Sequence, residues 1–282
     1  MLNATELLAK RSLLATSPQE MQRIFMAEDE SDLRLWSQRG ALKTARDVQQ
    51  SLLPLRTPVV PGLRIEARST PALEVGGDHY NFFWARGGCL GVLIADVSGK
   101  GMPAALVATM LRATFRTLSY GNTDVGDVLA RVNVWMAKSL RQGMFVTCTY
   151  GVLDTARRTF TWARAGHEPL LRAGQGGRIE ILAPPGFPLG IADNAEFRRH
   201  LEVQRLQLED GDFLLLFTDG LTEAMDAEGE EFGMHRILHA LSRTVSSSPS
   251  RAGLELIEEA LQAHIGDEPL ADDLTLLSIA VG

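Results

Sequence analysis

The stretch GVLIADVSGKGMPAALVATMLRATFRTL, residues 91–118, decides the fold of this chain. A continuous apolar run from Leu90 to Ala95 leads into it and is short enough for a buried strand. Asp96 ends the run, and the glycine turn Ser98-Gly99-Lys100-Gly101 follows. Pro103 suits the first turn of a helix, and apolar side chains then recur at i, i+4, i+8 and i+11, which predicts a helix over 103–119.

Asp96 is therefore expected between a buried strand and a buried helix. An ionised carboxylate in such a place is costly unless something compensates its charge, and a bound cation is one common answer. The alternative is an ordinary aspartate in a strand-to-helix turn. The stretch alone leaves both open.

Length and composition indicate one large domain, or one domain with an extension, because the chain has 282 residues of which 45% are hydrophobic. No stretch reaches 18 apolar residues and the start lacks a secretory leader, so we expect a cytoplasmic protein without a membrane segment. Cys89 and Cys148 are far apart and form no metal-ligand spacing, which favours a reducing compartment. The net charge of −7 gives no general attraction for nucleic acid or anionic membranes.

Residues 1–53 are predicted to form an N-terminal helical extension of one or two helices, the second over about 31–53. Its face is partly apolar, so this helix either folds onto the main domain or pairs with its copy in a homodimer. Residues 54–62 contain three prolines and a glycine and read as an extended connector. The main domain is therefore expected over 54–282.

The rest of the chain alternates hairpins with pairs of helices. Further helices are predicted at 125–141, 233–244 and 251–264, and strands at 63–69, 81–84, 90–95, 145–154, 159–165, 170–172, 178–182, 213–217 and 274–281. Hairpins predominate, which favours an α+β sandwich of antiparallel sheets with helical layers over a doubly wound parallel sheet.

Acidic side chains stand at four predicted strand ends, each beside glycine or a second acid. They are Asp78 after a glycine pair, Asp96, Asp219 before Gly220, and the pair Asp272-Asp273. Oxygen-rich sites of this type suit Mg²⁺ and Mn²⁺. Each acid alone is more simply structural, so the hypothesis of a metal site depends on their shared context.

Other motifs are absent. The histidines form no HExxH, and His235 and His239 lack a third ligand. Gly99-Lys100 fails as a phosphate loop because Ile94 occupies the required first glycine, and Val97-Ser98-Gly99 fails as a nucleophile elbow because Asp96 replaces its glycine.

Seven blocks in series resemble the bacterial sigma-regulating serine phosphatases, the sporulation and stress-response branch of the protein phosphatase 2C superfamily. The blocks are VQQSLLP (48–54), EVGGDHYNFF (74–83), ADVSGKGMPAAL (95–106), AGHEPLL (165–171), FPLGI (187–191), LFTDGLTEA (216–224) and ADDLTLL (271–277). Any one block is weak evidence, but the ordered series covers about residues 45–282 and is specific.

The resemblance implies a sandwich of two antiparallel sheets that holds two Mg²⁺ or Mn²⁺ ions. Asp96 matches the bridging ligand, Asp78, Asp219 and Asp272 match the other acidic ligands, and the Val97 carbonyl matches a backbone ligand. Asp273 follows the last ligand, and the sequence does not decide whether it also binds metal. Glu74 is expected to support the ligands rather than to bind metal.

The implied activity is hydrolysis of a phosphoserine or phosphothreonine on a protein by a water that two metal ions activate, with Asp78, Asp96 and Asp219 as the catalytic carboxylates. The usual substrate in this family is a phosphorylated STAS-type anti-sigma-factor antagonist. Residues 1–53 are too few for a full sensory domain, so we expect them to mediate dimerisation or docking of a regulatory partner, and thereby to set the position of helix 103–119.

Three positions depart from the wider superfamily. Ser98 stands where many relatives outside this branch carry a histidine assigned as general acid. No arginine matches the one that grips the substrate phosphate, Arg68 being the nearest before the glycine pair. Asn81 replaces a second acid. Proton donation and phosphate gripping are therefore unassigned.

Two rival functions use the same acids. One is a non-catalytic pseudophosphatase that binds a partner, against which the four intact acidic positions argue. The other is a two-metal nucleotidyl transferase or cyclase, for which the sequence offers no nucleotide-binding segment.

Overall fold

The computed structural model describes residues 30–174, 177–246 and 253–282. The chain divides into two compact units, residues 1–51 and residues 52–282. The described part of the first unit belongs to helix α3 (Glu30–Leu52), close to the predicted 31–53. A first helix before it would lie outside the described residues. Among the described helices, none is both long and apolar enough to cross a membrane.

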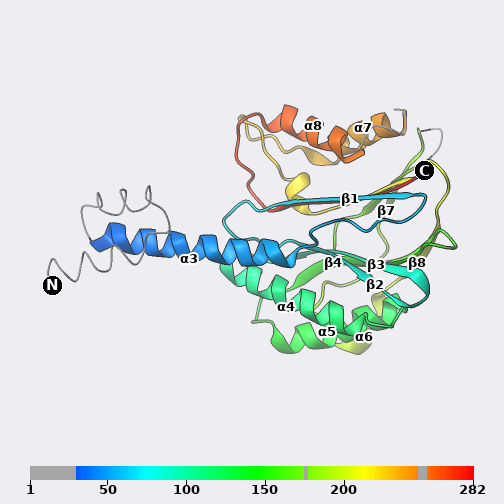
Figure 1. The fold of residues 1–282 in the computed structure, drawn as a ribbon, viewed down its shortest axis with the longest axis horizontal. Helices are drawn as coiled ribbons and strands as arrows, with labels where there is room; N and C mark the ends of the chain where they lie inside the picture. Colours follow the sequence, from blue (N-terminus) through cyan, green and yellow to red (C-terminus); the bar gives the residue numbers. More distant parts are fainter. Residues whose placement is uncertain (1–29, 175–176, 247–252) are drawn as a thin grey trace. The chain divides into compact units, whose positions relative to one another are not determined.

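The second unit contains two five-stranded sheets in which every neighbouring pair is antiparallel (Figure 1). One sheet has the order β1 (Leu63–Thr70), β10 (Leu274–Val281), β9 (Phe213–Phe217), β6 (Leu170–Ala173), β7 (Ile179–Leu182). The other has the order β2 (His79–Trp84), β3 (Cys89–Val97), β4 (Val146–Asp154), β5 (Thr159–Ala165), β8 (Val203–Gln207). The predicted sandwich of two antiparallel sheets is confirmed.

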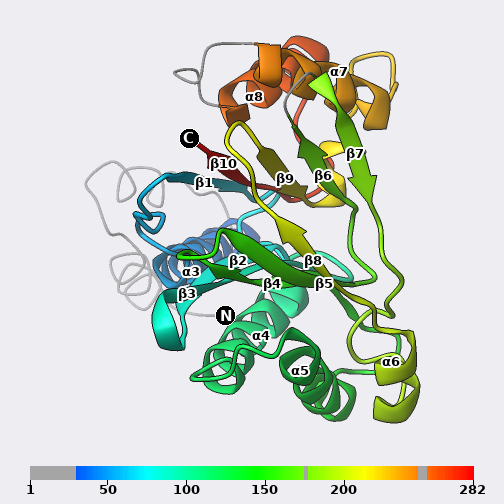
Figure 2. The same ribbon diagram turned by 90° about the vertical axis from the view of Figure 1, so that its right-hand side faces the viewer.

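Helices cover the outer faces of both sheets, as Figures 1 and 2 show. Helices α4 (Met102–Leu118), α5 (Val125–Ser139) and α6 (Asn194–His200) lie on the β2–β8 sheet. Helices α7 (Gly233–Ser246) and α8 (Gly253–Ile265) lie on the β1–β7 sheet. The short 3₁₀ turns η1 (Arg86–Gly88) and η3 (Asp219–Leu221) complete the elements of this unit.

The position of strand β3 in the fold explains why the run from Leu90 to Ala95 is apolar without interruption. Successive side chains of a strand point to opposite faces of the sheet. Leu90, Val92 and Ile94 pack between the two sheets, whereas Leu93, Ala95 and Val97 pack under the helices. Because both faces are buried, the strand shows no alternation of polar and apolar residues.

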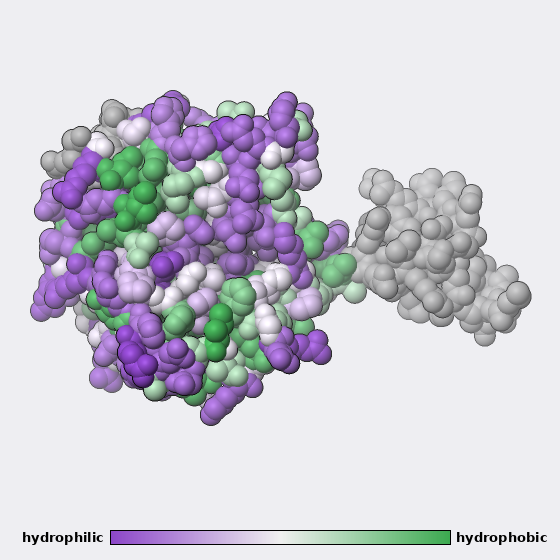
Figure 3. Space-filling model, turned by 180° about the vertical axis from the view of Figure 1, so that it is seen from behind, coloured by the Kyte–Doolittle hydropathy of each residue, from purple (hydrophilic) through white to green (hydrophobic). Residues whose placement is uncertain are grey.

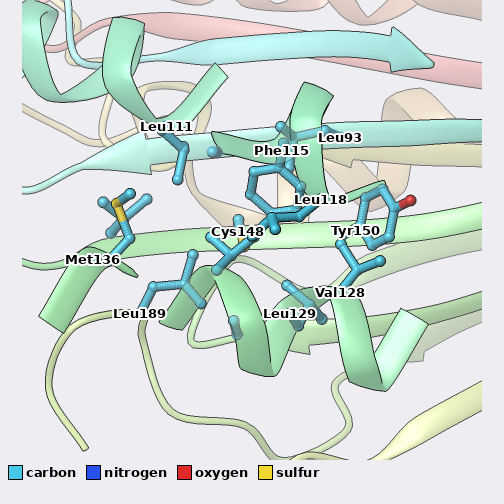
Figure 4. Close-up of a cluster of buried hydrophobic side chains, with 14 of the residues drawn as sticks. Leu93, Leu111, Phe115, Leu118, Val128, Leu129, Met136, Cys148, Tyr150 and Leu189 are labelled. Atoms are coloured by element: carbon cyan, nitrogen blue, oxygen red, sulfur yellow. The ribbon is translucent and has the colours of Figure 1, made fainter. Parts of the chain in front are cut away.

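The hydrophobic core forms three layers: one between the sheets, one under α4–α6 and one under α7 and α8. In the layer under α4 and α5, Leu111 and Phe115 of α4 meet Val128 and Leu129 of α5 over β3 and β4 (Figure 4). This packing fixes α4 against β3, the strand that carries Asp96.

The predicted elements match the structure within about two residues, with two omissions. The first omission is α6, which is only seven residues long. The second is β8, an edge strand in which Val203, Arg205 and Gln207 are exposed, so its sequence lacks a buried face. The first two residues of the predicted helix 251–264 lie outside the described residues.

Large apolar side chains remain exposed on several separate elements, among them Trp84 on β2, Leu106 on α4 and Trp135 on α5. On the face drawn in Figure 3, hydrophobic patches are separated by hydrophilic side chains. Scattered exposure of this kind is normal for a folded protein.

Candidate active site

A cavity of about 320 Å³ opens where the strand ends of the two sheets meet. The end of β3 faces the end of β9 and the start of β10 there, because the turn after β9 carries Asp219 and the residues before β10 carry Asp272. The residues that line the cavity are Asp96, Val97, Ser98, Gly99, Lys100, Phe145, Thr147, Gly166, His167, Glu168, Asp219 and Asp272. Four of the six residues predicted to bind metal are among them.

Asp96 is the last but one residue of β3, and its position in the alternation directs it to the inter-sheet side, like Ile94. Burial raises the pKa of this carboxyl to about 7, and the nearby carboxylates of Asp219 and Asp272 contribute in the same direction. An acid in this state is poised to exchange its proton for a cation.

Asp219 and Asp272 bring the carboxylates of the other sheet into the same cavity. Burial raises the pKa of Asp219, and Asp272 adds to the shift by repulsion. Asp272 is already paired: its Oδ2 lies 2.7 Å from Lys100 Nζ, and its Oδ1 accepts a 2.8 Å hydrogen bond from the Asp273 backbone.

Asp78 lies just before β2 and is buried. Its Oδ2 accepts a 2.7 Å hydrogen bond from Thr218 Oγ1, at the end of β9. Its Oδ1 is buried without a hydrogen-bond partner in the described part of the chain. Burial, and secondarily Asp96, raises the pKa of Asp78 well above its ordinary range. Burying a carboxylate oxygen without a partner costs free energy, and a cation bound to this atom would offset that cost.

Asp273 is placed differently from Asp272. Its two carboxylate oxygens accept backbone hydrogen bonds from Ala72 at 2.8 Å and from Gly77 at 2.6 Å. Asp273 does not line the cavity. Its contacts hold the segment before Asp78 against β10, so in this geometry Asp273 positions a neighbouring acid while Asp272 faces the cavity.

The Val97 carbonyl, the predicted backbone ligand, is closely approached by Gly77. A methyl group added to Gly77 would stand 2.8 Å from this oxygen and 3.1 Å from the Ala104 side chain of α4. Only glycine therefore lets the segment before Asp78 pass beside the end of β3. The next residue, Ser98, is fixed by two hydrogen bonds with the Phe145 backbone, at 3.0 and 2.8 Å.

The positions that depart from the superfamily have structural roles. The hydroxyl of Ser98 accepts the Phe145 hydrogen bond. The Oδ1 of Asn81 accepts from the Phe82 backbone, and by alternation Asn81 lies on the helix-covered side of β2 with Phe83. Arg68 is 3.7 Å from Glu258 of α8 and does not line the cavity. Proton donation and phosphate gripping remain unassigned by these residues.

Other predicted positions lie away from the cavity. Glu74 is exposed and is not among the lining residues. His235 and His239 are exposed on α7. Neither observation points to a metal role for them.

The structure adds residues that sequence reasoning did not assign to the site. Glu168 lines the cavity, and burial followed by Asp219 raises its pKa. His167 Nδ1 is 2.9 Å from Thr147 Oγ1, and burial lowers the pKa of His167 to about 3, so this histidine is neutral. Both residues belong to the block AGHEPLL, which lies between two predicted strands. That position was the signal in the sequence that could have placed them in the site. Lys100 is the third addition.

The donor set fits a hard divalent cation. Within the described residues, no three His, Cys, Asp or Glu side chains are already grouped closely enough to hold a metal ion. The available donors are nevertheless oxygens, the preferred ligands of Mg²⁺ and Mn²⁺. Asp96 and Asp219, both with raised pKa values, share one cavity. One buried oxygen of Asp78, whose pKa is also raised, has no partner among the residues that the structure describes. Bound cations would reverse these costs.

Comparison with known proteins agrees with this description. Residues 86–282 match the family model described as Stage II sporulation protein E (SpoIIE). The chain is 31% identical over 240 residues to phosphoserine phosphatase RsbU of Bacillus subtilis, covering 85% of this chain and 69% of that protein. It spans between 41% and 69% of the length of the first three curated relatives that it matches.

Solved structures share the fold. The SiaA-PP2C domain of Pseudomonas aeruginosa superposes with a TM-score of 0.72 at 23% identity, covering 86% of this chain and 96% of that one. RsbX, solved in complex with magnesium, superposes with a TM-score of 0.60 at 17% identity, covering 80% of this chain and 99% of that one. At these identities the likeness concerns the fold alone.

Proposed function

Because this chain belongs to the SpoIIE family of PP2C-like serine phosphatases, we propose that it is a metal-dependent phosphatase that hydrolyses phosphoserine or phosphothreonine on a partner protein. The main structural support for this function is the cavity in which Asp96 from one sheet faces Asp219 and Asp272 from the other. The relationship to RsbU, a phosphoserine phosphatase, supports the reaction type.

The residues that would hold two Mg²⁺ or Mn²⁺ ions are the predicted ones: Asp78, Asp96, the Val97 carbonyl, Asp219 and Asp272. When bound, such ions lower the pKa of a water molecule and neutralise charge on the phosphoryl oxygens. The sharing of one cavity by Asp96, Asp219 and Asp272 supports this assignment. Asp273, with both oxygens bound to backbone N–H groups, is the weaker candidate.

The chain's own residues prepare the site in three ways. Thr218 orients Asp78 by a hydrogen bond to Oδ2, which leaves Oδ1 available. Asp273 accepts a hydrogen bond from the Gly77 backbone and so fixes the chain segment that precedes Asp78. The raised pKa of Asp96 means that this carboxyl gives up a proton when it becomes a ligand, so loading the site releases protons to solvent.

The substrate we propose is a phosphorylated STAS-type anti-sigma-factor antagonist, the usual substrate of the family that the sequence blocks resemble. The relatives RsbU and RsbP are phosphoserine phosphatases, which supports the proposed phosphoserine chemistry. The N-terminal extension, which includes α3, is proposed to dock a regulatory partner or to dimerise. A cytoplasmic location fits such a substrate and remains part of the proposal.

A phosphate-release assay separates the alternatives. Full-length protein is mixed with a phosphoserine-containing STAS protein, with and without Mn²⁺, beside the variant Asp96→Asn. We expect metal-dependent release that is absent in the variant. Binding of the phosphorylated partner without release would instead support the pseudophosphatase. Turnover of a nucleoside triphosphate, with no release from the phosphoprotein, would support the nucleotidyl transferase or cyclase.

A further inference from the structure

The cavity has an electrostatic problem that its proposed substrate makes worse. Asp96, Glu168, Asp219 and Asp272 line it, and all are acids. A phosphoserine carries about two negative charges near neutral pH, so the carboxylates repel it. The proposed metal ions would offset part of this repulsion, and a side-chain cation that faces the phosphate would reduce it further.

Among the described residues that line the cavity, Lys100 is the only lysine or arginine. His167, also a lining residue, is neutral because burial lowers its pKa to about 3. Arg164 approaches from behind, but its guanidinium donates to the backbone oxygens of His167 at 2.5 Å and Pro184 at 3.0 Å. The positive charge that protein side chains bring to the cavity wall is therefore that of Lys100.

The ammonium of Lys100 is held but not saturated. Its Nζ lies 2.7 Å from Asp272 Oδ2 and donates a 2.8 Å hydrogen bond to the Ala271 carbonyl. An ammonium has three donors, so one has no partner among the described residues. The side chain is 52% exposed. It can therefore meet a ligand that enters from solvent.

Asp272 is also a proposed metal ligand, so Lys100 and a metal ion would compete for its carboxylate. While Asp272 is free, the lysine neutralises it. A dication bound to this carboxylate would remove most of its attraction for Lys100, while the Ala271 carbonyl would still accept a hydrogen bond from the amine. The anion that then enters the cavity is the substrate phosphate.

We propose that Lys100 is the phosphate-binding residue of this site, its ammonium donating to a non-bridging phosphoryl oxygen after leaving Asp272. The inference rests on the proposed phosphatase function and fills the position for which no arginine was found. Lysine suits this role as a point charge. The turn Ser98–Gly101 thus contributes an amine to the substrate as well as a carbonyl to the metal site.

The test uses the full chain and the variants Lys100→Met and Lys100→Arg, with Lys138→Met as the matched control on the exposed side of α5. Calorimetry measures the dissociation constants of Mn²⁺, and then of inorganic phosphate for the Mn²⁺-loaded protein. Kinetics on a phosphoserine peptide give KM and kcat separately.

We expect the phosphate dissociation constant and KM to rise about tenfold or more in Lys100→Met, as the loss of a charge-assisted hydrogen bond implies. Lys100→Arg should recover part of this, and Lys138→Met should behave as wild type. Mn²⁺ should bind Lys100→Met as tightly as wild type or more tightly, because a competitor for Asp272 is removed. A purely structural lysine would not produce this pattern.

Unchanged phosphate affinity and KM in Lys100→Met would overturn the proposal, as would a loss explained wholly by weaker Mn²⁺ binding. The two proposals fail separately. Lys100-dependent phosphate binding in a protein that hydrolyses no phosphoprotein would reject the phosphatase and keep the phosphate site. If the wild type hydrolyses the phosphoprotein and Lys100→Met does so with the same KM and kcat, the phosphatase function is kept and the role of Lys100 in binding phosphate is rejected.

Discussion

Thr218 Oγ1 donates a 2.7 Å hydrogen bond to Asp78 Oδ2, and this bond joins the end of β9 in one sheet to the start of β2 in the other. The same hydroxyl oxygen accepts a 2.9 Å hydrogen bond from the Thr275 backbone. Thr218 is fully buried. The orientation of one proposed metal ligand thus depends on a hydroxyl group from the opposite sheet.

Replacing Thr218 by valine keeps the shape of the side chain and removes the hydroxyl. Asp78 would lose its bound partner and the Thr275 N–H its acceptor. We expect the Mn²⁺ dissociation constant, measured by calorimetry, to rise about 10- to 100-fold, as for other groups that orient metal ligands. Thr218→Ser is the control, since it keeps the oxygen. Equal Mn²⁺ affinity in the valine and serine variants would contradict the orienting role.

Replacing Asp96 by asparagine tests the proposed bridging ligand. Phosphate release from a phosphoprotein should fall to background at saturating Mn²⁺, and the calorimetric signal for Mn²⁺ should weaken strongly. Circular dichroism should show an intact fold, because the change removes a charge and leaves the size of the side chain. Full activity with supplied metal would exclude Asp96 from the site.

The pH dependence of stability follows from the raised pKa of Asp96 in metal-free protein. This carboxyl has a pKa of about 7 when folded and an ordinary value of 3.8. Between these values the folded state holds a proton that the unfolded state has lost. The protonated Asp96 carboxyl therefore contributes fully to the free energy of unfolding below about pH 3.8. This contribution is lost as the pH rises through about 7.

The measurement is the melting temperature in EDTA from pH 4 to pH 8, compared with Asp96→Asn. The wild type should become progressively less stable relative to the variant as pH rises. The difference should grow to roughly 10 °C, because a pKa raised from 3.8 to about 7 corresponds to about 4 kcal/mol and about 1 kcal/mol shifts the melting temperature of a domain this size by roughly 2–4 °C. Saturating Mn²⁺ should stabilise the wild type selectively. A constant difference across this range would refute the shift.

Gly77→Ala tests the close approach of the glycine pair to β3. The new methyl group would meet the Val97 carbonyl at 2.8 Å and Ala104 at 3.1 Å, so backbone must move. We expect a loss of about 1–3 kcal/mol in the free energy of unfolding, typical of overpacking, together with weaker Mn²⁺ binding. Gly126→Ala is the matched control, since its methyl group would meet only ordinary contacts at 3.4 Å and beyond. Wild-type metal affinity in Gly77→Ala would show that the Val97 carbonyl tolerates displacement.

Removing residues 1–51 tests the N-terminal extension without touching the second unit. If α3 pairs with a second copy, the mass measured by sedimentation should fall from a dimer to a monomer. If it docks a regulator or positions α4, basal phosphatase activity should change at constant Mn²⁺. A truncated protein with the same subunit number and the same activity would refute both roles.

The fold was predictable to the extent that local pattern determines it. Residues 90–118 predicted the buried strand β3, its glycine turn and the apolar stripe of α4. The strands of the three hairpins β2–β3, β4–β5 and β6–β7 were predicted as well. The pairing of β1 with β10 is not a local property, and the edge strand β8 lacks the buried face that reveals a strand.

For the candidate site, the sequence displays the acids but not the groups that they contact. Asp78, Asp96, Asp219 and Asp272 share a context of strand ends and glycines, which sequence displays. The assignment of Thr218 to Asp78, of Ala72 and Gly77 to Asp273, and of Lys100 to Asp272 depends on which strand ends meet in space. No spacing along the chain contains that information, because the two sheets bring these residues together only after they pack.

The position of β10 has a consequence for the timing of biosynthesis. Within its sheet β1 pairs with β10 alone, and β10 also separates β1 from β9. A nascent chain that has emerged only as far as Ala271 has an unpaired β1 and lacks Asp272, the ion-pair partner of Lys100. Sheets built from such distant segments form late in folding. A ribosome-bound intermediate therefore lacks both a complete sheet and the complete set of proposed metal ligands.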